Sequence, residues 1–351
     1  MKNSSSVDAL DLDIVDVLQS DPRVSWSQIA ALVDRSEVSV ARRWKQLKMN
    51  RLAWTGIALH PSASQGAFIE MRCWSSDYHN LCKKLCSHPD VVTVGTTTGD
   101  FNLYCIVIGV SLSAVLNRID KELPELRLCE RVRINLFHQI TGGVDWRQGI
   151  LDLNIARGGK IGSPPAALSE FHRVRNERGQ LSSAPHAQFR PLFLAFGADA
   201  RRPLSHVSNE LRTSYSMVKR TLKHLVDQRQ IVFRCDVARE AFDFPISMVL
   251  SLKVAPKHAE EVAFRIGAWK ETRFCASVAS TANLIIIAGL RDLVDGENFM
   301  GKLSELEFPL EVVQRSINTR MIKIYGRMLD QDGRALQHIA VDPWAGETVS
   351  S

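Results

Sequence analysis

The sequence lacks the long apolar segments that mark membrane-spanning and secreted proteins. Its 351 residues contain no run of about 18 apolar residues, the length that a membrane-spanning helix needs. The polar start, residues 1–13 (MKNSSSVDALDLD), has no apolar stretch of the kind that a signal peptide carries. We therefore expect no membrane association and a cytoplasmic location.

Cysteines at disulfide or zinc-site spacing are also missing. Seven cysteines are present, an odd number, and they do not form a disulfide framework. Residues 82–88 (CKKLCSH) bring Cys82, Cys86 and His88 together, but zinc sites usually have a second pair, and none follows. Cys82 and Cys86 share one face of a predicted helix, so we interpret them as buried thiols, with metal binding or redox sensing as the alternative. No metal and no cofactor are predicted.

Motifs of catalysis are absent as well. Residues 158–163 (GGKIGS) lack the strand, the spacing and the Lys-Ser/Thr pair of a phosphate loop, and no arrangement of serine, histidine and aspartate indicates a catalytic triad. The net charge of +6 and the pI near 9.0 permit a nucleic acid as partner without requiring one. The prediction is a protein that is not an enzyme.

An internal repeat is the most informative feature that is present. At an offset of 178 residues and without a gap, residues 21–52 align with residues 199–230, and nine of the 32 aligned positions are identical. The identical pairs are Asp21/Asp199, Arg23/Arg201, Ser27/Ser205, Ser36/Ser214, Val40/Val218, Arg42/Arg220, Lys45/Lys223, Leu47/Leu225 and Arg51/Arg229. The chain is therefore interpreted as a tandem duplication.

Each copy is predicted to form three helices with a tight turn before the last. In the first copy Ile14, Val15 and Leu18 form the apolar stripe of a first helix, which the sequence DPR then ends. Ser25 is placed to cap a short second helix, and Ser36 is placed to cap a third. This order is that of a helix-turn-helix.

The third helix combines an apolar inner face with a basic outer face. Val40, Trp44 and Leu47 recur at helical spacing and point inward, which places Arg42 and Lys45 on the opposite side. A solvated surface also explains a basic face, but it does not require the same residues in both copies. Because a capped helix with arginine near its start suits the major groove of DNA, we favour DNA contact.

These helices predict the residues of a DNA interface. Short polar side chains in the first turn suit base edges, and basic side chains suit phosphates or guanine. The predicted contacts are Ser36, Glu37, Ser39, Arg42, Arg43 and Lys45 in the first copy, and Ser214, Ser216, Lys219, Arg220 and Lys223 in the second.

A different pattern follows each set of helices. In the first copy, the pattern predicts a strand at residues 66–74, a helix at 76–88 and two strands at 91–110. A second helix and a last strand are predicted between residue 110 and residue 140, which gives the order βαββαβ. The segments after the second copy repeat this order. The predicted fold class is α+β, with two tandem units that each have a three-helix helix-turn-helix followed by a ferredoxin-like βαββαβ domain.

Both halves resemble the Lrp/AsnC family of bacterial transcription regulators, and the chain resembles a tandem form with two units in one polypeptide. Residues 10–47 are similar to the opening helix and the capped recognition helix of the family, and residues 96–107 (TTTGDFNLYCIV) to its TGDYD hairpin. The resemblance covers residues 8–140 and, more weakly, residues 187–325. It implies that each ferredoxin-like domain is a RAM domain, which in this family binds effectors and forms oligomers.

The resemblance also implies an effector site. At some positions, however, this sequence differs from the family pattern. The family hairpin lies near the effector pocket, so Thr98, Gly99 and Asp100 are the predicted effector residues, with a simple hairpin turn as the alternative. The second copy has no equivalent of this motif in residues 279–284. The glycine that the family has before its recognition helix is replaced by Asp34 and Arg212, which leaves the turn geometry open.

The predicted domain boundaries follow from these patterns. They are 1–60 for the first helix-turn-helix, 61–140 for the first RAM domain, 141–184 for a linker with one short helix, 185–240 and 241–325 for the second pair, and 326–351 for a polar tail. The expected partners are double-stranded DNA and an amino acid-like small-molecule effector. Internal pairing of the two RAM domains and further homo-oligomers are also expected. The alternative function is an enzyme similar to siroheme decarboxylases, whose fold also has two such units.

Overall fold

The computed structural model describes residues 7–74, 76–144, 146–147 and 182–347. Most of the predicted linker, including its short helix, lies outside these residues. Within them, no helix has both the length and the apolar character needed to span a membrane.

The first three helices form as predicted. They are α1 (Ala9–Ser20), α2 (Trp26–Val33) and α3 (Glu37–Met49). Asp8, Ser25 and Ser36 cap them, each accepting a hydrogen bond from a backbone amide three residues later. Asp34 ends α2 with a φ of 51°, so an aspartate provides the left-handed turn that a glycine would favour. The helix-turn-helix geometry is therefore retained without the glycine.

The second set of helices repeats this arrangement with one change. The helices are α7 (Arg190–Gly197), α8 (Leu204–Glu210) and α9 (Tyr215–Asp227), with a 3-10 turn, η5 (Ala187–Phe189), before them. Ser214 caps α9, and Arg212 has a φ of 50° in the preceding turn. Pro203 stands where the first copy has the capping Ser25, so α8 has no side-chain cap.

Two ferredoxin-like domains follow the helices. The first contains β2 (Gln65–Arg72), α4 (Tyr78–Ser87), β3 (Val91–Thr97), β4 (Leu103–Gly109), α5 (Leu112–Asn117) and β5 (Arg131–Gly142), with short turns η1 (Pro61–Ala63), η2 (Arg118–Glu122) and η3 (Pro124–Leu128). The second contains β7 (Ile246–Val254), α10 (Pro256–Gly267), β8 (Thr272–Ala279), β9 (Leu284–Leu290), α11 (Leu293–Ser304) and β10 (Leu310–Ile324), after the turn η6 (Arg239–Phe242). Their strand orders, β3-β4-β2-β5 and β10-β7-β9-β8, are equivalent.

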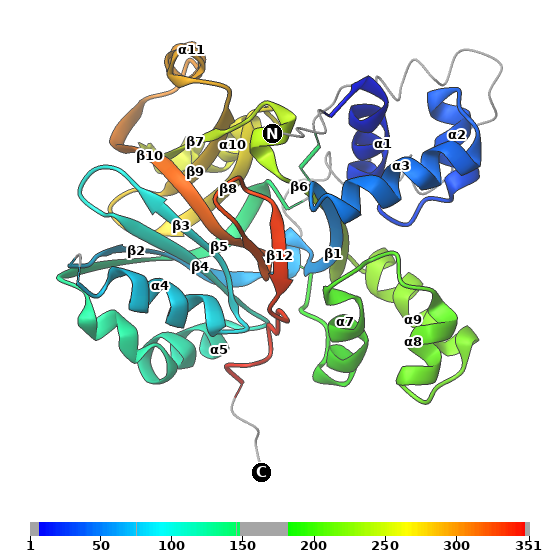
Figure 1. Ribbon diagram of the computed structural model, residues 1–351. Coiled ribbons are helices and arrows are strands. Elements are labelled where there is room, and N and C mark those ends of the chain that lie inside the picture. The colour runs from blue at the N-terminus through cyan, green and yellow to red at the C-terminus, as the bar shows by residue number, and fades with distance from the viewer. Residues whose placement is uncertain (1–6, 75, 145, 148–181, 348–351) are drawn as a thin grey trace.

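The two sheets join into one closed ring of antiparallel strands. β5 pairs with β8, and β10 pairs with β7 along its first half and with β3 along its second half. The edge strands of each domain are thus covered by the other. The internal pairing of the two domains, predicted from the sequence, is present in the structure, and Figure 1 shows the helices of both domains outside the ring.

A large apolar core fills the ring and is shared by both units. Phe68, Tyr104 and Phe137 come from the first unit, and Phe274 and Ile285 come from the second. Separate cores lie between each sheet and its own helices. Cys82 and Cys86 belong to the core under α4, where burial raises the pKa of their thiols to about 11 and about 12. This burial agrees with their interpretation as core thiols.

The last segment is more than the polar tail that we expected. It contains β11 (Arg327–Leu329) and β12 (Ala335–His338), a hairpin that extends the sheet from β10. Trp344 is 4% exposed, packs edge-on against Phe193 and donates a hydrogen bond from Nε1 to the Pro185 carbonyl. Leu329 and Ala335 pack in a small core with Trp54 and Ile324, and Val341 and Trp344 belong to the shared core. The segment that we expected to be a polar tail, residues 326–351, is thus part of the fold over residues 326–347.

Candidate nucleic-acid interface and ligand cavity

The outer face of α3 carries two of the predicted DNA contacts in accessible positions. Val40, Trp44 and Leu47 are buried in the core of the helical domain. Arg42 and Lys45 are exposed on the opposite side of the helix. Both side chains are therefore available to phosphates or base edges, as the periodicity of the sequence indicates.

The start of α3 is equally accessible, with one exception among the predicted residues. Ser36 and Glu37 are exposed, and Ser39 is partly exposed beside them. Arg43 instead pairs with Asp8 and, at 3.3 Å from Nε to Oδ1, with Asp11. These ion pairs attach α3 to the first turn of α1, so Arg43 stabilises the domain rather than presenting a free guanidinium to DNA.

The corresponding face of α9 is equally accessible, and one of its predicted cations, Lys223, forms an ion pair. Ser214, Ser216, Lys219, Arg220 and Lys223 are all exposed. The Lys223 ammonium contacts the Asp227 carboxylate at 2.8 Å, an exposed pair of the (i, i+4) type that contributes little to stability.

Two equivalent arginines connect the two helical domains. Nη1 of Arg201 donates to the carbonyl oxygens of Pro22 at 2.7 Å and Val24 at 2.8 Å. Nη1 of Arg23 donates to the carbonyls of Ala200 and Arg202, which occupy the equivalent positions in the second copy. The contact is therefore reciprocal, as expected for two domains related by a local twofold axis.

Stacking and burial strengthen this contact. The Arg201 guanidinium lies 3.7 Å from the centre of the Trp26 ring, and the Arg23 guanidinium lies 5.2 Å from that of Phe196. Burial lowers the pKa of Arg201 to about 10. Lys48 adds an ion pair of 2.7 Å to Asp199 across the same boundary. The two recognition helices α3 and α9 are thus held in one mutual arrangement.

A short strand ladder beneath the helices has the same symmetry. β1 (Ala53–Leu59) follows α3, β6 (Ile231–Val237) follows α9, and the two strands pair antiparallel along their full length. Gly56 faces Arg234, its own counterpart at the repeat offset, so the local twofold axis passes between them. Figure 1 shows this ladder between the helical domains and the ring of strands.

The predicted effector residues form a hairpin turn at the junction of the two sheets. Gly99 has a φ of 94°, and all three residues are exposed. The Thr98 amide donates to the Ile317 carbonyl at 2.9 Å, and the Ile317 amide donates to Oγ1 of Thr98 at 3.0 Å. Thr98, Gly99 and Asp100 do not line the cavity described next, and their role as effector residues stays a prediction.

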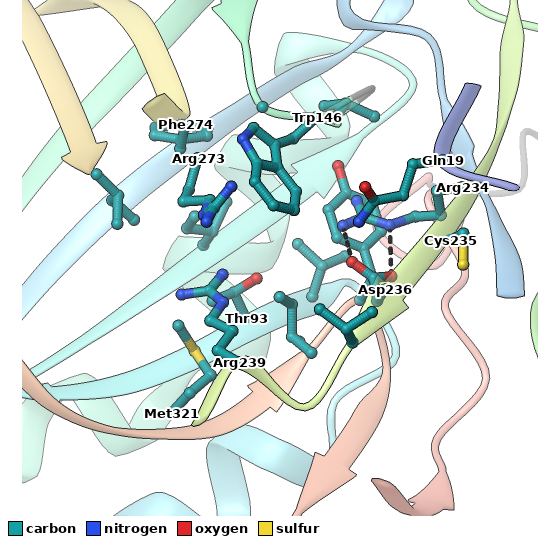
Figure 2. A pocket seen from close by; sticks show the side chains of 18 of the residues that line it. Gln19, Thr93, Trp146, Arg234, Cys235, Asp236, Arg239, Arg273, Phe274 and Met321 are labelled. Atoms are coloured by element: carbon teal, nitrogen blue, oxygen red, sulfur yellow. Dashed lines mark hydrogen bonds and ion pairs between the residues drawn. The ribbon is translucent and has the colours of Figure 1, made fainter. Parts of the chain in front are cut away.

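A cavity of about 70 Å³ lies between the ring of strands and β6. Arg273 from β8, Arg239 from η6 and Trp146 from the segment after β5 line it, together with Thr93 and Phe274. Figure 2 shows the guanidinium groups of Arg273 and Arg239 on the same side of this space, with Trp146 beside Arg273. Both units of the chain thus contribute to one basic cavity.

Comparison with known proteins identifies the first helical domain. Residues 7–48 match the AsnC-type helix-turn-helix domain. The chain carries an AsnC-type helix-turn-helix domain. The resemblance to the Lrp/AsnC family seen in the sequence is confirmed by this match, which covers α1, α2 and α3.

Two further similarities extend beyond the AsnC-type domain. Over 101 residues the chain is 27% identical to the HTH-type transcriptional regulator FL11 of Pyrococcus furiosus, covering 28% of this chain and 67% of that protein. The crystal structure of the siroheme decarboxylase NirDL with an iron-uroporphyrin III analogue is similar over 89% of this chain and 92% of that chain, with a TM-score of 0.56 and 13% identity. A second NirDL structure is matched over 92% and 95%, at 12% identity and the same TM-score. At these identities the likeness to NirDL shows a shared fold alone.

Sequence reasoning missed the residues that join the units and line the cavity. Arg23 and Arg201 were visible as an identical pair in the repeat, but no local pattern indicated their inter-domain contacts. Arg273, Arg239 and Trp146 come from three distant segments and share no motif. Only the closed pairing of the sheets brings them together.

Proposed function

We propose that this protein is a sequence-specific, DNA-binding transcriptional regulator of the Lrp/AsnC type. The observation that carries the proposal is the pair of serine-capped recognition helices, α3 and α9, held about a local twofold axis with basic faces exposed. The match of residues 7–48 to the AsnC-type domain and the similarity to the regulator FL11 support it.

One chain presents two recognition helices, which in most helix-turn-helix proteins requires a dimer. The two helices differ in sequence, so they address two unequal half-sites about one or two DNA turns apart. Basic side chains on the outer faces hold phosphates, and the residues at the helix starts meet base edges. Regulation by a small molecule and assembly into homo-oligomers belong to the same proposal.

Replacing Arg42 and Lys45 together by alanine should weaken DNA binding and reduce its dependence on salt. Each phosphate contact contributes about 0.9 to the slope of log Kd against log salt, because a bound cation releases a counterion from the DNA. The double variant should therefore lose a slope of roughly 1 to 2 with its folding intact. Fluorescence anisotropy at several salt concentrations, beside circular dichroism, measures both quantities.

The matched control is Lys83→Ala with Lys84→Ala on α4. These exposed lysines carry the same total charge and lie on the ferredoxin-like domain, away from α3. The control should keep the slope of the unmodified protein. The same slope in both double variants would show that α3 does not contact phosphates and would overturn the proposal.

The first copy should read DNA sequence more strongly than the second. Ser36, Glu37 and Ser39 begin α3, whereas Tyr215 and Met217, 53% and 43% exposed, follow the cap of α9. Small polar side chains suit base-edge hydrogen bonds better than bulky ones. Ser39→Ala should therefore relax sequence preference more than Ser216→Ala, measured by selection from a randomised DNA pool. An equal relaxation would contradict this ranking.

A second candidate function is a siroheme decarboxylase-like enzyme, which the fold shared with NirDL favours. The cavity lined by Arg273 has room for on the order of five water-sized groups, fewer than a tetrapyrrole requires, but a second cavity, of about 530 Å³, lies between α1 and the second unit. Against the enzyme, both copies keep exposed basic recognition faces, which it would not need. A Soret band on adding siroheme would favour the enzyme, and retarded DNA without any tetrapyrrole would favour the regulator.

A further inference from the structure

Arg273 is a buried cation whose side chain has neither a hydrogen bond nor an ion pair to any residue that the structure describes. The residue is only 8% exposed. Its Nε and Nη1 atoms are buried and form no hydrogen bond with any residue that the structure describes. Burial, together with the nearby charge of Arg239, lowers the pKa of Arg273 well below its usual value, against an opposing contribution from Glu271. A buried, unpaired guanidinium is costly to the folded state.

A second buried arginine of this cavity, Arg234, has an acidic partner, although its Nη1 is buried without a hydrogen bond among the described residues. Arg234 forms two hydrogen bonds with the Asp236 carboxylate, at 2.8 Å from Nε and 2.5 Å from Nη2. Within the described part of the chain, neither Arg273 nor Arg239 has an acidic side chain at ion-pair distance. Arg239 donates one hydrogen bond, to Oγ of Ser247 at 3.0 Å. Arg273 and Arg239 thus adjoin one cavity, and Asp236, an acid that lines it, is already paired with Arg234.

Aromatic side chains fix the orientation of the Arg273 guanidinium. Its central carbon lies 3.1 Å from the centre of the Trp146 ring and 4.5 Å from that of Phe244. Trp146 is itself held by a hydrogen bond of 2.9 Å from Nε1 to the Lys270 carbonyl. A guanidinium held in this way keeps its planar set of donors preorganised for a planar anion.

We propose that this cavity binds a small carboxylate ion, with Arg273 as its main anchor and Arg239 as a second cation beside it. The carboxylate would supply the counter-charge and the hydrogen-bond acceptors that the unpaired Nε and Nη1 atoms of Arg273 lack. The use of this ligand as an effector rests on the proposed regulatory function, whereas its binding does not.

The size and lining of the cavity narrow the ligand class. A volume of about 70 Å³ holds a ligand with on the order of five non-hydrogen atoms. Propionate and pyruvate have this size. Ile106, Ile140 and Phe274 offer an apolar wall for a short carbon chain. The carboxylate of Asp236 is engaged by Arg234, so an ammonium group would face cations without a free acid. The ligand is therefore a short carboxylic or 2-oxo acid rather than an amino acid.

The walls of the cavity connect it to both DNA-binding domains. Gln19 of α1 lines it, and so does β6, which follows α9 and pairs with the strand after α3. Next to Trp146, Nε of Arg147 contacts Oδ1 of Asp16 on α1 at 3.0 Å. A ligand that moves Trp146 or β6 therefore acts on the elements that hold both recognition helices.

The test is a thermal-shift and calorimetric titration of the full chain with matched small molecules, in the absence of DNA. Propionate and pyruvate carry the proposed anion, propionamide has the same shape without charge, and alanine adds an ammonium group. At roughly 100 times its Kd, a carboxylate should raise the Tm by about 3 °C or more, because it binds only the folded state. Propionamide and alanine should not. Tighter binding of inorganic phosphate than of every carboxylate would overturn the ligand class.

Variants of the two arginines test the anchor itself. Arg273→Met should abolish the carboxylate-dependent shift while the unliganded Tm stays equal or rises, because the unpaired charge is gone. A purely structural arginine would instead lower the Tm, and an undiminished shift in the variant would disprove the proposal. Arg239→Gln, which should weaken carboxylate binding about tenfold or more, is the second test variant if Arg273→Met does not fold.

Arg265→Met, on the exposed surface of α10, is the matched control and should keep full binding. Arg42→Ala with Lys45→Ala should also keep it, which separates this proposal from the DNA-binding one.

Discussion

Arg201→Ala should reduce affinity for a DNA fragment with both half-sites by about tenfold or more, while affinity for a single half-site changes little. Arg201 donates two hydrogen bonds to the Pro22 and Val24 carbonyls and stacks on Trp26. Hydrogen bonds from charged groups contribute about 1.5 to 3 kcal/mol each, so their loss should release the two helical domains from their fixed arrangement. Binding both half-sites would then require the DNA to order the domains.

Fluorescence anisotropy with paired and single half-site fragments measures this effect, once the fragments have been selected from a genomic DNA pool. Arg23→Ala should act in the same direction, because Arg23 makes the equivalent contacts to Ala200 and Arg202. Arg265→Ala removes the same charge from a helix far from the interface and should change neither affinity. An equal loss on both kinds of fragment would show that Arg201 contacts DNA itself or maintains the fold, and not the arrangement of the domains.

The local elements of this fold could be predicted because their signals are local. Ser25, Ser36 and Ser214 stand directly before apolar runs with helical period, and the structure uses all three as helix caps, two in the first helix-turn-helix and one in the second. The strand order βαββαβ followed from apolar runs separated by turn residues. The repeat then predicted two equivalent units and their internal pairing.

The candidate site could be predicted only where it lies on one element. Arg42 and Lys45 are exposed as the helical period requires, but Arg43 pairs with Asp8 and Asp11, which no spacing within α3 reveals. The cavity depends on the register of β5 against β8 and on a turn after β6, so it joins residues that are distant in sequence. Such contacts are decided by tertiary pairing, which periodicity does not encode.

The contact between the helical domains is symmetric, whereas the cavity is not, and the two therefore affect the recognition helices differently. The contacts of Arg23 and Arg201 are nearly equivalent, so they orient the two recognition helices without preferring either. The cavity is asymmetric, since Arg234 and Arg273 come from the second unit while Gly56 stands opposite Arg234. A ligand there would act unequally on the two helical domains. A duplicated chain permits this asymmetry, whereas two identical subunits would have two equivalent cavities.

Phe68→Ala should destabilise the whole chain by about 3 to 5 kcal/mol, because the core inside the ring belongs to both units. Phe68 is fully buried, and its ring centre lies 4.9 Å from that of Tyr104 and 6.3 Å from that of Phe274, across the boundary between the units. Denaturant unfolding followed by near- and far-UV circular dichroism measures the loss, and both units should unfold in one transition.

A double-mutant cycle decides whether the units share this core. Phe68→Ala and Phe274→Ala should be coupled by about 0.5 kcal/mol or more, because the two rings touch. Phe299 serves as the matched control: it is 2% exposed but packs against Trp269 under α11, in the core of the second unit alone. Phe68→Ala and Phe299→Ala should add to within about 0.5 kcal/mol. Additive effects in both cycles, or two separate unfolding transitions, would mean that the two sheets fold independently, and the ring would then be too weak to hold the cavity and the paired recognition helices in place.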